Sequence, residues 1–264
     1  MFNFYSLSSS SSGNCLLVRS DNTNILIDVG ISMKKINIEL EKIDLSLKDI
    51  NAILITHEHI DHCKSLCTIN RKYNIPIYTN SDTWYALSNI YDTINEDSKN
   101  FISFGKDFII GDLCINAFST SHDCANSCGY SIFKDNKKIC IATDMGYIDD
   151  NVFNCLSNSN FTFIESNYDT NMLDVGNYPY SLKKRISSNI GHLSNTQCSN
   201  AIAKLYKTNS NNFMLGHLSR ENNFPELALQ TVYDVLQAEH IDLNNITINI
   251  AEKDCLSNII TLEN

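Results

Sequence analysis

The sequence predicts a layered α/β domain, and three observations lead to this fold class. Short runs rich in β-branched and aromatic residues recur along the chain, and amphipathic helical patterns lie between many of them. The strands come first in clusters and then alternate with helices, which favours α/β layers over a bundle or an all-β barrel. Hydrophobic residues make up 43% and charged residues 19%, so a packed core is expected.

One domain is expected over residues 1–264. A chain of this length can bury a sizeable core. Three prolines and nine glycines leave little material for a linker, and neither a charge block nor a change of composition marks a boundary.

The individual elements are predicted from periodicity. Ten strands are expected where short apolar runs end at turn residues, namely 15–18, 24–28, 52–56, 75–79, 113–119, 129–133, 138–143, 161–165, 212–216 and 246–251. Six helices are expected where apolar residues repeat every three to four positions, namely 33–43, 60–73, 81–90, 180–190, 196–206 and 225–239.

Charge and composition limit the function classes. The net charge of −10 argues against a broad basic surface that coats nucleic acid, although a local basic site remains possible. The apolar runs are far shorter than the roughly 18 residues that suggest a membrane span. The first residues lack the features of a signal peptide, so a cytoplasmic location is expected, with the ten cysteines reduced.

Three of the seven histidines lie within one short segment, ITHEHIDHCK at 55–64. His57 and His59 are two positions apart and share a face if the backbone is extended, whereas Asp61 and His62 are adjacent and must diverge. This spacing predicts two neighbouring metal positions at a strand-to-helix turn, one begun by each pair. Imidazole and carboxylate ligands suit zinc, manganese or iron better than calcium.

The pattern HxHxDH resembles the signature of the metallo-β-lactamase superfamily. That resemblance implies an αββα sandwich with two metal ions at one edge, between the sheets. The preceding NILIDVG is similar to the first motif of the superfamily, in which an aspartate, here Asp28, supports the metal loops from behind.

Three further ligands are expected where later strands open into the site. His122 would complete the histidine set of the first ion, and His217 would complete the second. Asp144 would bridge both ions. The pair Asp61-His62 with a bridging Asp144 resembles phosphodiesterases and glyoxalase II-type thioesterases of the superfamily, so hydrolysis of a lactam is not expected.

His192 is the residue expected to distinguish a phosphodiesterase from a thioesterase. By resemblance to superfamily phosphodiesterases it would contact the scissile phosphate and protonate the leaving oxygen. Asp61 or Asp144 would orient the attacking hydroxide. The nearby run Lys183 to Arg185 is either a phosphate contact or a solvated helix face, and Arg220 is a weaker candidate for the same role.

Longer stretches resemble the YycJ/WalJ branch of the superfamily, among them SLSSSSSGNCLLV, RKYNIPIYTN, IATDMGYI and GHLSRENNFPELA. The resemblance implies that the Ser8 to Ser12 run lies near the site and that the substrate is DNA, degraded from 5′ to 3′. Ser65 stands where the superfamily usually has glycine, and SHDCANSCGY lacks a common proline. These departures concern local backbone geometry more than the ligands.

The function predicted is therefore a two-metal phosphodiesterase that uses a metal-bound hydroxide, with Zn²⁺ or Mn²⁺ as the ions. The expected substrate is nucleic acid, with DNA favoured and exonuclease activity implied by the resemblance. Three alternatives remain open: a hydrolase of a small phosphodiester, a thioesterase of the glyoxalase II kind, and a binding protein with a relic site.

Overall fold

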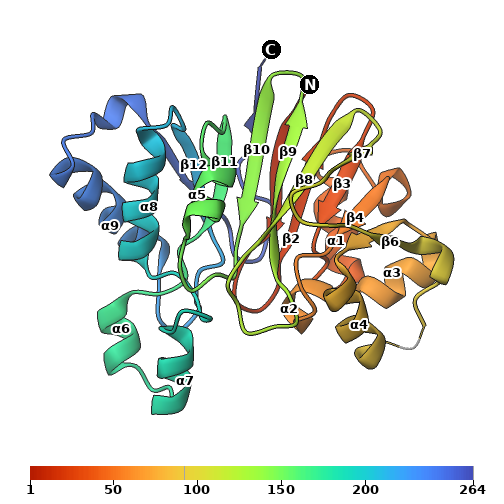
Figure 1. The fold of residues 1–264 in the computed structure, drawn as a ribbon, viewed down its shortest axis with the longest axis horizontal. Coiled ribbons are helices and arrows are strands. Elements are labelled where there is room, and N and C mark those ends of the chain that lie inside the picture. Colours follow the sequence, from red (N-terminus) through yellow and green to blue (C-terminus); the bar gives the residue numbers. More distant parts are fainter. Residues whose placement is uncertain (92, 264) are drawn as a thin grey trace.

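The computed structural model describes residues 1–91 and 93–263. Within this part of the chain, two seven-stranded sheets face each other, and helices cover their outer faces (Figure 1). The molecule is thus an αββα sandwich, as expected from the sequence.

The first sheet has the strand order β14-β1-β2-β3-β4-β5-β6. Its strands are β1 (Asn3–Ser8), β2 (Cys15–Arg19), β3 (Asn24–Ile27), β4 (Ala52–Leu54), β5 (Ile77–Thr79), β6 (Lys99–Phe101) and β14 (Ile260–Thr261). Strands β1 to β3 pair antiparallel and β3 to β6 pair parallel.

The second sheet has the order β13-β12-β11-β10-β9-β8-β7. Its strands are β7 (Asp107–Ile110), β8 (Leu113–Ser119), β9 (Cys128–Lys134), β10 (Lys137–Ala142), β11 (Phe161–Glu165), β12 (Asn212–Gly216) and β13 (Thr247–Ile250). Strands β7 to β10 pair antiparallel and β10 to β13 pair parallel. The carboxyl ends of parallel strands meet at one edge of a sheet, so residues that follow these strands are brought together.

Helices form the two outer layers and one projection. Those beside the first sheet are α1 (Met33–Glu41), α2 (Ile60–Cys63), α3 (Leu66–Tyr73) and α4 (Ser81–Ile90), and those beside the second are α5 (Asp150–Leu156), α8 (Asn195–Tyr206) and α9 (Pro225–Ala238). The short helices α6 (Thr170–Val175) and α7 (Tyr180–Ile186) lie below the sandwich in the view of Figure 1. Short 3₁₀ turns occur at Leu47–Asp49, Glu96–Ser98 and Leu243–Asn245.

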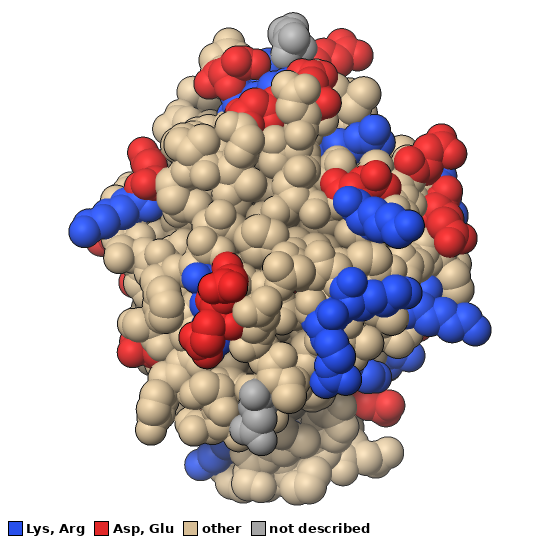
Figure 2. Space-filling model, turned by 90° about the vertical axis from the view of Figure 1, so that its right-hand side faces the viewer, with Lys and Arg blue, Asp and Glu red and all other residues tan. Residues whose placement is uncertain are grey.

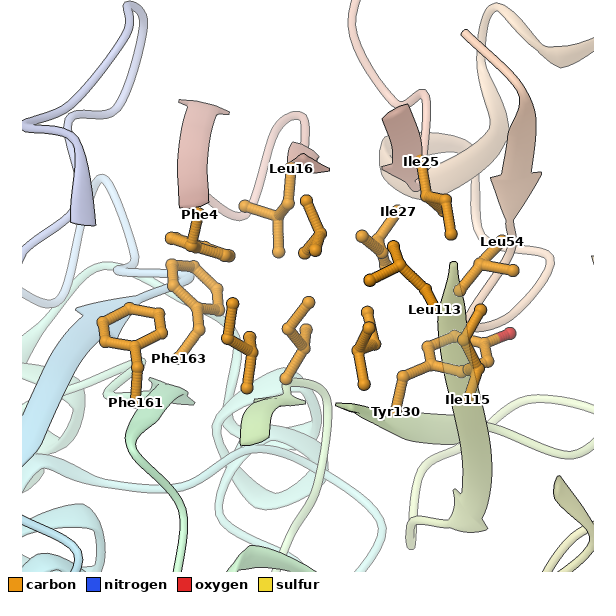
Figure 3. Packing of buried hydrophobic residues seen from close by; sticks show 14 of the residues in the cluster. Phe4, Leu16, Ile25, Ile27, Leu54, Leu113, Ile115, Tyr130, Phe161 and Phe163 are labelled. Atoms are coloured by element: carbon orange, nitrogen blue, oxygen red, sulfur yellow. The ribbon is translucent and has the colours of Figure 1, made fainter. Parts of the chain in front are cut away.

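The main core lies between the sheets, where side chains from both inner faces interdigitate (Figure 3). Phe4 of β1 packs against two rings of β11, with its ring centroid 4.8 Å from that of Phe161 and 5.3 Å from that of Phe163. Alternation along β3 sends Ile25 and Ile27 into this core, and the intervening leucine packs toward the helices. The burial holds the two sheets in fixed relative positions, and hence the site at their edge.

Three sequence expectations need correction. The helix expected over 60–73 is broken into α2 and α3, because the backbone N–H of Ser65 turns to the carbonyl of Val29. The helix expected over 180–190 ends at Ile186. The strands β1, β6, β7 and β14 and the helices α5 and α6 were not expected at all.

None of the helices in the described residues combines the length and the apolar character needed to cross a bilayer.

Candidate metal centre

The site forms where loops leave the carboxyl ends of strands from both sheets. His57 follows β4, and His59 immediately precedes α2, whose first turn carries Asp61 and His62. Gly30 allows this close approach, since a Cβ there would lie 1.6 Å from the carbonyl oxygen of Asp61. The second sheet contributes His122 after β8, Asp144 after β10 and His217 after β12.

Three of the residues that follow strands have left-handed backbone conformations. The φ angles of Asp28, Asp144 and His217 are 60°, 55° and 55°. Such angles cost non-glycine residues about 1–3 kcal/mol each and persist where the surroundings determine the conformation. At each position the chain turns sharply out of its strand, beside the cluster.

The structure brings together all seven side chains that the sequence singled out as ligands. One set has its candidate ligand atoms within 4.8 Å of one another and consists of His57, His59 and His122. A second set, within the same limit, consists of Asp61, His62 and His217. Asp144 lies between them, with its oxygens 3.2 Å from Nε2 of His62, 3.7 Å from Nε2 of His122 and 3.6 Å from Nε2 of His217.

Asp28 holds two of the imidazoles from behind. Its Oδ2 accepts a hydrogen bond from Nδ1 of His62 at 2.7 Å and another from the hydroxyl of Thr56 at 2.8 Å. Because that hydroxyl gives its proton to Asp28, it must accept from Nδ1 of His57, 3.0 Å away. In the neutral form of both histidines Nε2 is therefore the nitrogen without a proton, the arrangement seen where a second layer of residues orients metal-binding imidazoles.

The same arrangement recurs on the other sheet. Nδ1 of His122 donates to the carbonyl of Gly191 at 3.0 Å, and Nδ1 of His217 donates to Oε1 of Glu165 at 2.8 Å. When these imidazoles are neutral, the proton is on Nδ1 and Nε2 carries a lone pair. Nε2 of His217 and Oδ2 of Asp144 are buried without any hydrogen-bond partner among the described residues.

These unpartnered atoms fit divalent cations. A buried polar atom without a partner is costly, and lone pairs of imidazole and carboxylate that converge on one space are the ligands zinc and manganese accept. One set consists of three imidazoles, and the other combines two imidazoles with the carboxylate of Asp61.

His192 lies at the edge of the cluster. Its ring centroid is 5.0 Å from that of His122 and 5.3 Å from that of His217. Nδ1 donates to Oε1 of Glu165 at 2.7 Å, which leaves Nε2 for another partner. The side chain is 19% exposed, whereas that of His217 is 1% exposed, so His192 is the more accessible to a substrate.

Glu165 is the important residue that the sequence interpretation missed. It is completely buried and also accepts backbone hydrogen bonds from Met145 and Leu193. The signal was present, because Glu165 ends the strand β11 that lies between β10 and β12. A charged residue there occupies the same edge as Asp144 and His217.

The pKa values of the histidines shift in opposite directions. Burial, with the neighbouring imidazoles, lowers the pKa of His57 well below its usual value, which favours the neutral form that binds metals. Burial also disfavours a charged His217, but Asp144 and other carboxylates outweigh it and raise its pKa to about 10. Burial opposes ionisation of Glu165, yet His192 and His217 hold its pKa well below the usual value. The carboxylates of Asp144 and Glu165 thus favour positive charge beside them, whether on an imidazole or on a cation.

The basic run at 183–185 is partly engaged within the protein. The Arg185 guanidinium donates to Asp123, and the ammonium of Lys183 donates to the carbonyl of Asp174 at 2.7 Å. Arg220 pairs with both oxygens of Asp254, each at 2.8 Å, and also donates to Ser12. It is therefore held by the protein surface.

The serine-rich loop lies against the site, as the resemblance implied. The hydroxyl of Ser9 accepts from the backbone N–H of His217 at 2.8 Å. Nδ2 of Asn14, at the end of this loop, lies 3.2 Å from Nε2 of His62.

Comparison with known proteins agrees with this geometry. Residues 23–217 match the family profile described as "Beta-lactamase superfamily domain". The chain belongs to this superfamily, and within it to the YycJ/WalJ group, and the fold is that of the metal-dependent hydrolases.

Two relatives carry the group assignment. The chain is 37% identical over 234 residues to exodeoxyribonuclease YycJ of Bacillus anthracis, a match that covers 89% of each chain. It is 37% identical over 237 residues to exodeoxyribonuclease WalJ of Streptococcus pneumoniae, covering 89% of this chain and 88% of the other.

Solved structures show the same fold. The metallo-β-lactamase fold protein YhfI of Bacillus subtilis matches with a TM-score of 0.72 at 14% identity, over 97% of this chain and 99% of that one. The short form of human tRNase Z matches with a TM-score of 0.62 at 18% identity, over 98% and 100% of the two chains.

Proposed function

We propose that this chain is a two-metal phosphodiesterase that removes nucleotides from the ends of DNA. The observation that carries the proposal is that two sets of candidate ligand atoms converge on either side of Asp144. Hydrogen bonds from Nδ1 of His62, His122 and His217 fix the orientation of these imidazoles. The names of the two relatives, both exodeoxyribonucleases, support DNA as the substrate. The polarity that we propose, 5′ to 3′, comes from the family resemblance alone.

Seven residues would hold the ions. His57, His59 and His122 would bind one divalent ion, Zn²⁺ or Mn²⁺, Asp61, His62 and His217 would bind the other, and Asp144 would bridge them. When bound, such ions lower the pKa of water toward neutrality and offset charge on the phosphoryl oxygens.

Two residues would act on the substrate. Asp61 is 22% exposed while Asp144 is 3% exposed, so Asp61 is the carboxylate we assign to orienting the attacking water. His192 would protonate the leaving oxygen from Nε2, because Nδ1 is committed to Glu165.

The chain as a whole would form one hydrolase domain over 1–264, and we propose that it works in the cytoplasm, as expected from the sequence. Expression of a tagged chain followed by cell fractionation tests the location.

One substrate panel tests the proposed activity. End-labelled duplex DNA, single-stranded DNA, RNA, bis-p-nitrophenyl phosphate and a glutathione thioester are incubated with the purified chain and Zn²⁺ or Mn²⁺. We expect DNA to shorten progressively from its 5′ end. Turnover of bis-p-nitrophenyl phosphate without DNA cleavage would point instead to a small phosphodiester, and turnover of the thioester alone would contradict the proposal.

Variants assign the roles. Asp144→Ala is expected to abolish cleavage, and His192→Ala to retain metal but lose most turnover. Normal cleavage by Asp144→Ala would refute the bridge, and loss of metal from His192→Ala would make that residue a ligand.

A further inference from the structure

Residues 170–190, which we call the arm, contribute little to the core. They comprise α6 and α7 with their connections and lie outside the two layers of helices (Figure 1). In α6 the buried residue is Leu173, and in α7 every residue is at least partly exposed. Most side chains of the arm therefore do not contribute to stability by burying apolar surface.

Large apolar side chains of the arm face solvent. Val175 is 84% exposed, Tyr180 is 71% exposed and Ile190 is 50% exposed. Single exposed apolar side chains are common on protein surfaces, so these gain meaning only together with the charge of the arm.

The arm is basic although the chain is acidic. It holds three cations, the run at 183–185, and one carboxylate, Asp174, within a chain of net charge −10. Two of the cations have partners in the protein, as described above. The third, Lys184, has its ammonium 4.8 Å from the centre of the Tyr180 ring, one helical turn away. Ring and cation thus form one exposed platform on α7.

The platform is attached directly to the candidate metal centre. The backbone N–H of His192 donates to the carbonyl of Ile186, the last residue of α7, at 2.9 Å. The hydroxyl of Ser121 donates to the carbonyl of Asn189 at 2.7 Å, and Arg185 pairs with Asp123, next to His122. A helix rises about 1.5 Å per residue, so Tyr180 lies roughly 9 Å along the axis from Ile186.

That span suits a few nucleotides. Stacked nucleotides of one strand rise about 3.4 Å each, so roughly 9 Å corresponds to two or three of them. Aromatic rings bind the faces of unpaired bases, and neighbouring cations hold the backbone. In a duplex these base faces are covered by stacking, which makes a single strand the better fit.

The charges on another face are arranged differently. On the face at the right of Figure 1, acidic and basic side chains lie around a largely uncharged centre, and the basic ones gather toward one edge (Figure 2). That face, beside α3 and α4, carries its own group of neighbouring basic side chains on one side of an uncharged centre.

We propose that the arm binds the single-stranded part of a nucleic acid substrate, with a base stacked on Tyr180 and a phosphate held by Lys184. The proposal rests on the proposed function for its substrate class. It adds a binding surface outside the metal centre and a preference for unpaired strands.

Binding measured separately from cleavage tests this proposal. The probe is a fluorescein-labelled oligothymidylate of about 20 nucleotides, longer than the site of a single-strand binding fold, with phosphorothioate linkages that resist cleavage. Fluorescence anisotropy with the metal-loaded protein gives Kd. We expect Tyr180→Ala and Lys184→Ala each to raise Kd by about tenfold, and Tyr180→Phe to keep it near the wild-type value.

Matched controls are available outside the arm. Tyr85 on α4 is 74% exposed, and Lys106 is an exposed lysine in the turn before β7, so Tyr85→Ala and Lys106→Ala should leave Kd unchanged. Turnover of bis-p-nitrophenyl phosphate should be unchanged in the two control variants, which would show that these substitutions leave the candidate metal centre intact.

An unchanged Kd in Tyr180→Ala would overturn the assignment of the arm. Equal loss in the control variants would overturn it too. If the wild type binds the probe through Tyr180 but does not cleave unmodified DNA, the nuclease function fails and the binding surface stands.

Discussion

Nδ1 of His192 lies 2.7 Å from Oε1 of Glu165. The same oxygen accepts a hydrogen bond from Nδ1 of His217 at 2.8 Å. One buried carboxylate therefore orients two imidazoles that belong to different loops. The candidate metal centre and the proposed acid are thereby linked through one side chain.

Glu165→Gln should reduce turnover and also lower stability. The amide oxygen of glutamine can accept from the two imidazoles but carries no charge, and its amide nitrogen would face the backbone N–H groups of Met145 and Leu193. We expect bis-p-nitrophenyl phosphate turnover to fall about 10–100-fold, the usual effect of replacing a residue that orients a site. Steady-state kinetics and metal analysis measure the change. Glu39→Gln, another buried acid, contacts Lys42 and is the control, and an equal loss there would show a general folding effect.

Asp28→Asn should weaken metal binding. The change removes the charge that faces Nδ1 of His62 and leaves the side chain nearly the same size. Metal affinity, measured by competition with a chelator, is expected to fall about 10–100-fold. Asp112→Asn, at an aspartate that accepts from Ser20 and Thr23 away from the site, should keep wild-type affinity. Unaltered affinity in Asp28→Asn would exclude a supporting role.

Removal of metal should lower thermal stability. Ions bound to the folded state add about 2.7 kcal/mol of stability when their concentration is 100 times Kd. We therefore expect Tm to fall on chelation and to recover when Zn²⁺ or Mn²⁺ is restored, as measured by differential scanning fluorimetry. In Asp144→Ala the metal-dependent shift should shrink, whereas a shift as large as that of the wild type would argue against the bridge.

Phe163→Ala should destabilise the sandwich. The ring is fully buried between the sheets and packs against Phe4. Deleting such a ring costs about 3–5 kcal/mol because a cavity is left. Urea unfolding measures the change, and Phe101→Ala, whose ring is 67% exposed, is the comparison. A loss below that of the exposed variant would contradict the packing described for this core.

The convergence of the candidate ligands could be predicted from the sequence, because several of them follow the ends of predicted strands. Each of His57, Asp144 and His217 follows a strong strand pattern, so the fold class places them at one edge. Glu165 was missed although it ends a predicted strand, because a charged residue that ends an apolar strand is common and its two histidine partners lie 27 and 52 positions away.

Several elements depend on tertiary contacts that periodicity does not reveal. Strand β1 contains Asn3 and Ser6, polar residues whose burial comes from the surrounding sheet. The break between α2 and α3 arises because Ser65 hydrogen bonds to the loop after β3. The pairing of Arg185 with Asp123, 62 positions apart, likewise appears only in the folded chain.

Anomalous diffraction from crystals soaked in Mn²⁺ tests the central claim most directly. We expect two peaks about 3.5–4 Å apart, one among His57, His59 and His122, the other among Asp61, His62 and His217, with Asp144 between them. A single peak, or peaks away from these side chains, would contradict the two-metal account.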